Sequence, residues 1–230
     1  MLEKLAKQTA VYGISTIAVR FLSYLLTPVF TRVFEPEAYG IVTDVYALIP
    51  FALVVLTMGL ESAYFRFAAK ADAAAAAAGG TEGEIAARAR AGKRRLFATA
   101  WGVTLLAASL FFLLTAFGRE RVAEWMGEAY VAHPEYVLLV AAVVWFDVAA
   151  CLPFSRLREQ GRAMTFVGIK ALGVVVNVAL AIGFALAGLY GTPFGVGWVF
   201  VANLIASAVT FNVILLTTDR TVPRIDRGGV

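Results

Sequence analysis

The sequence predicts an all-α, polytopic membrane protein with six transmembrane helices. The chain is 60% hydrophobic and only 16% charged, whereas a soluble domain is nearer half apolar and a quarter charged. Its mean hydropathy is +0.78. Apolar runs of about 20 residues, the length that crosses a hydrocarbon core about 30 Å thick, recur along the chain. Together these features exclude an ordinary soluble domain.

The apolar runs predict a single six-helix bundle over residues 1–230. We expect spans at 8–33, 41–67, 96–117, 136–154, 164–188 and 197–217. The first run follows Lys4 and Lys7, as the apolar part of a signal peptide would. However, it is too long, contains Arg20 and is not followed by a small-residue cleavage site. We therefore interpret it as a retained first span.

Two segments outside the spans are polar. Residues 70–95 combine an alanine run with Gly79-Gly80 and the cluster Lys93-Arg94-Arg95. This low complexity predicts a basic cytoplasmic loop that is flexible or partly helical. We interpret the cluster as a topology anchor that meets anionic lipid headgroups, not as a nucleic-acid site. Residues 218–230 are expected to form a cytoplasmic tail or linker.

Positive charges are distributed unequally between the two sides of the predicted bundle. Both termini lie on one side because the number of spans is even, and fifteen of the 20 lysines and arginines fall on that side. Arg32, Arg119 and Arg121 fall on the other side, where the connections are acidic. Cytoplasmic connections carry the excess of lysine and arginine in membrane proteins. The bias therefore predicts that both termini are cytoplasmic.

A polar stripe with an arginine at its middle runs along the first predicted span. Its members recur every three or four residues, within about 100° of the helix surface, and are Thr9, Tyr12, Thr16, Arg20, Ser23, Thr27 and Thr31. A charge at mid-bilayer is costly unless it faces a bundle interior or a wet cavity. Hydroxyl groups alone would also suit a packing seam between helices. The arginine favours a cavity lined by Arg20, Thr16, Ser23 and Thr27.

Asp147, in the fourth span, is the main acidic candidate for this cavity. It lies at a depth similar to that of Arg20, so the two residues either form a structural salt bridge or are two poles of one hydrated cavity. Asn177 is a further candidate and shares a helix face with Lys170 in the fifth span. Lys170 is expected to extend toward the cytoplasmic interface.

The remaining polar residues of the spans have weaker signals. Asn203 and Asn212 lie on roughly opposite faces of the last span, so we expect structural roles for them and no shared cavity. Glu61 and Arg66 are five residues apart and do not face each other on a helix, so each needs another partner. Together with Arg156, we expect these two residues to form a cytoplasmic gate or a structural contact.

No catalytic or metal-binding arrangement is apparent in the sequence. Cys151 is the only cysteine, so an intrachain disulfide is impossible. His133, the only histidine, lies in a polar connection and has no second ligand type beside it. The sequence also lacks a nucleophile–base set and a phosphate-binding loop. We therefore expect neither an enzyme nor a bound cofactor or metal.

Several motifs, taken in order, resemble one family. Residues 31–40 (TRVFEPEAYG) resemble the first external turn of polysaccharide flippases, the O-antigen (Wzx-like) exporters of the multidrug/oligosaccharidyl-lipid/polysaccharide superfamily. Residues 59–67 (GLESAYFRF) are similar to the end of that family's second helix. Residues 147–162 resemble its connection between the fourth and fifth helices, and Asn177 and the turn at 191–197 fit the next part of the family pattern.

The resemblance implies a carrier of undecaprenyl-pyrophosphate-linked oligosaccharide in the bacterial inner membrane, serving lipopolysaccharide or other cell-envelope polysaccharide synthesis. Alternating access would move the sugar headgroup through a central cavity while the lipid tail stays in the bilayer. Arg20 would compensate the charge of the pyrophosphate in a low-dielectric site. Asp147 would keep Arg20 hydrated and oriented, or would take part in ion coupling.

Members of this family have two six-helix lobes that face each other, and this chain resembles the first lobe. A truncated product, half of a split transporter and a lobe that dimerises all remain open. The implied partners are the lipid-linked oligosaccharide, membrane lipids, and a second lobe, a second copy or polysaccharide assembly proteins. Two other functions remain open. One is a multidrug or small-cation exporter, which would favour an acidic, aromatic cavity, and the other is a non-transporting scaffold of an assembly complex.

Overall fold

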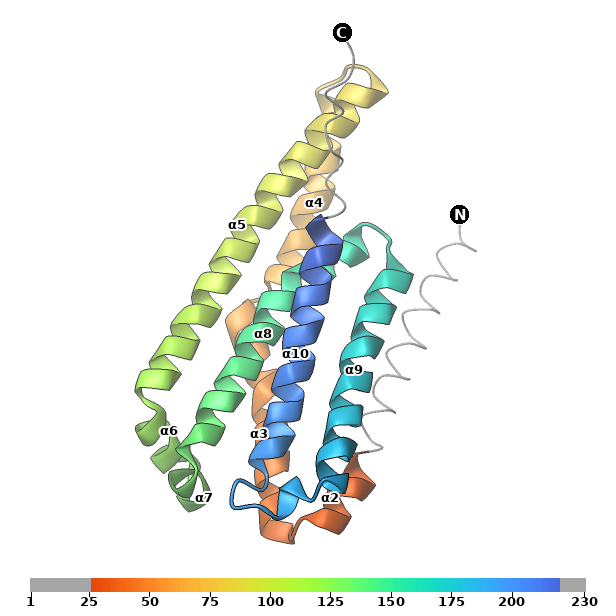
Figure 1. The fold of residues 1–230 in the computed structure, drawn as a ribbon. Coiled ribbons are helices and arrows are strands. Elements are labelled where there is room, and N and C mark those ends of the chain that lie inside the picture. The colour runs from red at the N-terminus through yellow and green to blue at the C-terminus, as the bar shows by residue number, and fades with distance from the viewer. Residues whose placement is uncertain (1–25, 220–230) are drawn as a thin grey trace.

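The computed structural model describes residues 26–219, which form helices joined by short connections. Five helical stretches are long and apolar enough to cross a membrane. The protein is therefore an all-α, polytopic membrane protein (Figure 1). Most of the first predicted span lies outside the described residues. Its described end is the 7-residue helix α2 (Thr27–Val33).

The last three predicted spans correspond to single helices. The ranges 136–154, 164–188 and 197–217 match α8 (Pro134–Glu159), α9 (Ala163–Leu186) and α10 (Gly197–Asp219) to within a few residues at each end. Three short helices complete the connections around them, namely α6 (Arg119–Met126), α7 (Glu128–Ala132) and the 3-10 helix η1 (Leu189–Gly191).

The second predicted span is divided between two helices. The range 41–67 falls on α3 (Pro36–Thr57) and α4 (Leu60–Ala77), which belong to one candidate membrane stretch that is interrupted between the two helices. Met58 and Gly59 between them adopt left-handed conformations with φ of 49° and 69°. This conformation is costly for methionine, which has a Cβ, but not for glycine. Two such residues in succession end α3 and start α4 in a new direction.

The segment 70–95 is a helical hairpin, so of the two alternatives, a flexible or a partly helical loop, the structure favours the helical one. α4 continues to Ala77, and α5 (Glu82–Phe117) begins after only four connecting residues. The alanine run supports α4 because alanine is the best helix former. Thr81 and Glu84 form a reciprocal capping box at the start of α5, which supplies acceptors for free backbone N–H groups.

The hairpin of α4 and α5 extends beyond the rest of the bundle (Figure 1). α5 has 36 residues, or about 54 Å of helix at 1.5 Å per residue, which exceeds the hydrocarbon core. We call this end of the molecule the hairpin end. It also carries the α8–α9 turn and the end of α10, whereas α6, α7, η1 and the α2–α3 turn lie at the opposite end (Figure 1).

α8 is the central helix of the bundle. Of its apolar window, 61% is buried, against 17% to 39% for the other four candidate spans. It packs most extensively against α10 and α5, and α10 in turn packs against α9. The outer helices instead expose large apolar side chains, such as Leu106, Leu114 and Val54. An exposed apolar surface of this kind is expected where helices meet lipid.

Aromatic side chains hold the opposite end together. The Tyr136 hydroxyl donates to the Phe194 carbonyl (2.7 Å), and the Tyr190 hydroxyl donates to the Ala181 carbonyl (3.0 Å). Tyr130 of α7 donates to the Ile41 carbonyl at 3.4 Å. Burial raises the pKa of the Tyr130 phenol to about 12, so this group stays a neutral donor over the physiological range.

The close approach of α9 and α10 depends on Gly173, and this generates a first prediction. A Cβ at Gly173 would overlap the Thr210 hydroxyl, whereas a Cβ at Gly168 on the same helix meets nothing within 4 Å. Gly173→Ala and Gly168→Ala gain the same helix propensity. We therefore expect Gly173→Ala to be less stable than Gly168→Ala by about 1–3 kcal/mol, the usual cost of overpacking.

The measurement is the free energy of unfolding in mixed detergent micelles. Thr210→Ala removes the overlapping hydroxyl and should abolish most of the difference between the two alanine variants. If Gly173→Ala and Gly168→Ala are equally stable in the protein that retains Thr210, then α9 and α10 are not in close contact at Gly173.

Candidate functional site

A cavity of about 710 Å³ lies within the bundle and is lined by residues of α2, α3, α8, α9 and α10. It combines apolar walls with hydroxyl, amide and charged groups. The polar residues of the lining are Thr27, Tyr39, Thr43, Tyr46, Asp147, Lys170, Asn177, Asn203, Ser207 and Thr210. Five helices contribute to one space, so the cavity is a property of the tertiary fold.

Asp147 and Lys170 give the cavity an acidic and a basic group. Asp147 projects from α8 and interacts with the Ser207 hydroxyl on α10 and with the charge of Lys170 on α9. Within residues 26–219, no ion pair of 4.0 Å or less joins Asp147 to Lys170. The Lys170 ammonium instead lies 4.2 Å from the centroid of the Phe154 ring. The two charges therefore share the cavity without neutralising each other through direct contact.

Three of the six cavity residues expected from the sequence can be placed. Thr27, Asp147 and Asn177 line this cavity, and Asn177 also interacts with the Tyr46 hydroxyl. Arg20, Thr16 and Ser23 lie outside the described residues, and so does the expected relation between Arg20 and Asp147.

Lys170 and Asn203 line the cavity although the sequence reasoning gave them other roles, and it did not single out Tyr39, Thr43, Tyr46, Ser207 or Thr210. Lys170 was expected to extend to the interface and Asn203 to have a structural role, but both line the cavity. Their helices turn these faces toward α8. The signal for Lys170 was its shared face with Gly173 and Asn177, which also line the cavity. Asn212 does not line the cavity with Asn203, and its exposed side-chain amide donates within its own helix to the Ala208 carbonyl (2.8 Å), not across to another helix.

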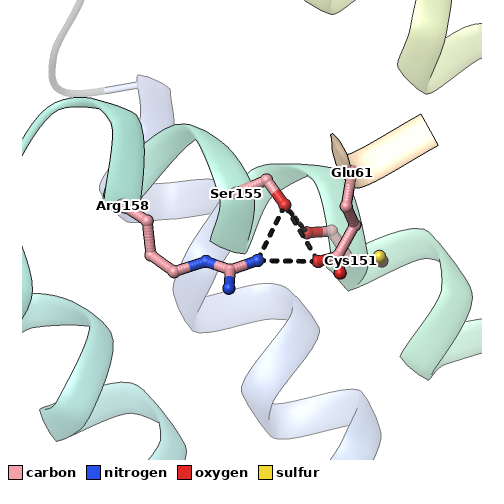
Figure 2. A network of polar contacts seen from close by, with 4 residues as sticks. All are labelled: Glu61, Cys151, Ser155 and Arg158. Atoms are coloured by element: carbon pink, nitrogen blue, oxygen red, sulfur yellow. Dashed lines mark hydrogen bonds and ion pairs between the residues drawn. The ribbon is translucent and has the colours of Figure 1, made fainter. Parts of the chain in front are cut away.

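Glu61 joins α4 to α8 through a polar network near the hairpin end (Figure 2). Its Oε1 accepts from Arg158 Nη2 (2.8 Å) and from the Ser155 hydroxyl (2.9 Å). Arg158 Nη2 also lies 3.2 Å from the Ser155 hydroxyl, which in turn lies 3.1 Å from the Cys151 carbonyl. Glu61 was expected to need a partner other than Arg66, and Ser155 and Arg158 of α8 are its partners.

A second set of charged contacts binds the hairpin to the end of α8. Lys93 of α5 pairs with Asp72 of α4 and with Glu159 of α8, each at 2.7 Å. The Arg156 guanidinium lies 4.7 Å from the Phe97 ring centroid. Arg66 is exposed and is not part of these contacts. The structural alternative for Glu61 and Arg156 therefore has direct geometric support, whereas a gating role stays a prediction.

The chain was compared with known proteins in three ways. A family model described as polysaccharide biosynthesis protein matches residues 5–225, nearly the whole chain. No curated protein and no solved structure gave a significant match. Among residues 26–219, no cluster of three or more histidine, cysteine or acidic residues could hold a metal ion.

The Glu61–Arg158 pair generates a second prediction. Glu61→Arg or Arg158→Glu alone places two like charges together between α4 and α8, so each should lower the thermal unfolding midpoint in detergent. The charge-swapped double variant restores the opposite charges. Because the side chains are 40% and 35% exposed, we expect a coupling energy of about 1 kcal/mol, at the upper end for a partly solvated pair.

Arg66 provides the matched control. Arg66→Glu reverses an exposed charge on the same helix and should leave the midpoint nearly unchanged. A double variant no more stable than the sum of its single changes would contradict an ion pair between Glu61 and Arg158.

Proposed function

The chain belongs to the polysaccharide biosynthesis protein family, and we propose that it moves lipid-linked oligosaccharide across the bacterial inner membrane. The cargo is an undecaprenyl-pyrophosphate-linked oligosaccharide destined for a cell-surface polysaccharide such as O-antigen, and the mechanism is alternating access. The observation that carries this proposal is the polar cavity of about 710 Å³ among otherwise apolar spans.

The lining of the cavity suits the headgroup of such a lipid. Sugar hydroxyl groups need both donors and acceptors, which Asn177, Asn203 and Ser207 supply. The pyrophosphate needs a cation in a site that excludes bulk water. Lys170 provides one cation in the lining, and Arg20 is proposed as a second. The volume is typical of a site that encloses a polar headgroup, while the lipid tail remains in the bilayer.

Asp147 is proposed to balance the charge of the empty cavity. A single buried ammonium would carry a large desolvation cost, which the nearby carboxylate offsets until an anionic headgroup arrives. Alternating access further requires an opposing six-helix lobe, which a second lobe or a second copy of the chain would supply. Export of a small organic cation fits less well, because Lys170 would repel the cargo.

The two asparagines of α10 give a third prediction, tested in cells. Asn203 lines the cavity, whereas Asn212 is exposed and bonded within its own helix. In cells lacking the gene, lipid-linked oligosaccharide should accumulate on the inner side, and the wild-type gene should relieve this. Lys170→Gln should reduce the rate of export about tenfold or more, the effect of losing a charge-assisted contact. Asn203→Leu should reduce it by about fivefold, the effect of losing a neutral hydrogen bond.

Asn212→Leu is the matched control and should rescue like the wild type. Equal rescue by Asn203→Leu, Lys170→Gln and Asn212→Leu would contradict the role of the cavity. Absence of accumulation in the deletion strain, with no second carrier present, would instead favour a non-transporting scaffold.

Orientation in the membrane gives a fourth prediction. We propose that the hairpin end and both termini are cytoplasmic, because the hairpin end carries most of the lysines and arginines among residues 26–219. In a Cys151→Ala background, an impermeant maleimide added to intact cells should label Glu128→Cys in α7 but not Ala78→Cys at the hairpin tip. Both sites are exposed, so broken cells should show labelling of both. The reverse pattern in intact cells would overturn the orientation.

A further inference from the structure

A second pocket, of about 370 Å³, lies at the hairpin end and shares no residue with the large cavity. It is lined by Arg162, from the turn between α8 and α9, and by Val213, Leu216 and Thr217, from the last turns of α10. The large cavity and the family match assign no role to it.

One nitrogen of the Arg162 guanidinium in this pocket lacks a hydrogen-bond partner among the described residues. This nitrogen, Nη1, is buried. The backbone of Arg162 is fully used, because its N–H donates to the Leu157 carbonyl (3.0 Å) and its carbonyl accepts from Phe166 N–H (3.1 Å). Buried polar atoms nearly always have a partner, and one without a partner costs about 1–3 kcal/mol.

Among the described residues, the acidic side chains nearest in sequence to Arg162 already have cationic partners. Glu61 is engaged by Arg158, and Glu159 is engaged by Lys93. α9 starts directly after Arg162 and has neither an acidic residue in its first turn nor a side-chain cap. The N-terminus of a helix attracts anions, so the helix adds to the positive potential. The pocket is therefore suited to an anion.

The remaining walls of the pocket are apolar and open outward. Val213 and Leu216 are aliphatic, and Leu216 is 64% exposed on the outer surface of α10. The Thr217 hydroxyl donates to the Val213 carbonyl (2.7 Å). In the sequence, the apolar run of α10 gives way to Thr217-Thr218-Asp219-Arg220, so we infer that Arg162 and Thr217 lie near the boundary between hydrocarbon core and headgroups. A ligand here would have its anionic group at the boundary and its apolar part toward the bilayer.

We propose that this pocket binds the phosphate group of an anionic glycerophospholipid. The Arg162 guanidinium contacts phosphate oxygens, with the planar geometry that makes arginine a good phosphate ligand. An acyl chain lies along Val213 and Leu216. The apolar wall favours a lipid over free phosphate as the ligand, because free phosphate has no apolar part to bury against that wall. The site does not depend on the cargo of the large cavity.

Native mass spectrometry of the purified full-length chain, titrated with phosphatidylglycerol, tests this site. Arg162→Gln should weaken the tightest phosphatidylglycerol-binding step about tenfold, the effect of losing one hydrogen bond to a charged group. Arg90→Gln removes an exposed arginine of α5 that does not line the pocket and should bind like the wild type. Phosphatidylcholine, with no net charge, should bind all three proteins weakly.

A second variant keeps the proposal testable if Arg162→Gln folds poorly. Val213→Phe retains the guanidinium but fills the apolar wall, and should weaken binding similarly while inorganic phosphate has no effect. Unchanged phosphatidylglycerol binding in Arg162→Gln would overturn the site. Equal loss in Arg90→Gln would also overturn it, by showing general attraction of lipid to basic residues. Displacement of the lipid by equimolar inorganic phosphate would overturn the lipid site and indicate a site for free anions.

Discussion

The cost of placing charge within the hydrocarbon layer is the constraint on which the structure depends. Asp147 and Lys170 belong to apolar helices, and neither can face lipid without a cost of several kcal/mol. The fold resolves this by turning both residues into one cavity with Ser207 and Asn177. α8 must then be central, because it is the helix that carries Asp147. The outer helices are free to present leucine and valine to the lipid.

The charged contacts near the hairpin end serve a different purpose from the cavity. Glu61 and Lys93 bind α4 and α5 to the last turns of α8, where water can reach the side chains. The break at Met58 and Gly59 separates α4 from α3. α4 therefore starts as a separate helix, and its first turn is held to α8 by the Glu61–Arg158 ion pair. The central helix is thereby connected both to the cavity and to the hairpin that projects beyond the membrane.

Much of this arrangement follows from the sequence, and the exceptions have physical causes. Hydropathy placed α8, α9 and α10 because a membrane span needs a fixed apolar length. It could not locate the break at Met58, since methionine rarely adopts a left-handed conformation and suits an apolar helix. Composition suggested a loop at 70–95, although alanine-rich segments are good helices when paired. The contacts of Glu61 and the position of Lys170 depend on rotation and register between helices, which hydropathy does not specify.

The central claim is that the headgroup of a lipid-linked oligosaccharide occupies the cavity. Site-specific photo-crosslinking tests it most directly. A benzophenone amino acid at Val174, which lines the cavity, is compared with one at the adjacent Val175, which is 52% exposed outside it. The account predicts an adduct that contains oligosaccharide at Val174 and none at Val175. Adducts with ordinary phospholipid alone at Val174, or equal oligosaccharide adducts at both positions, would contradict it.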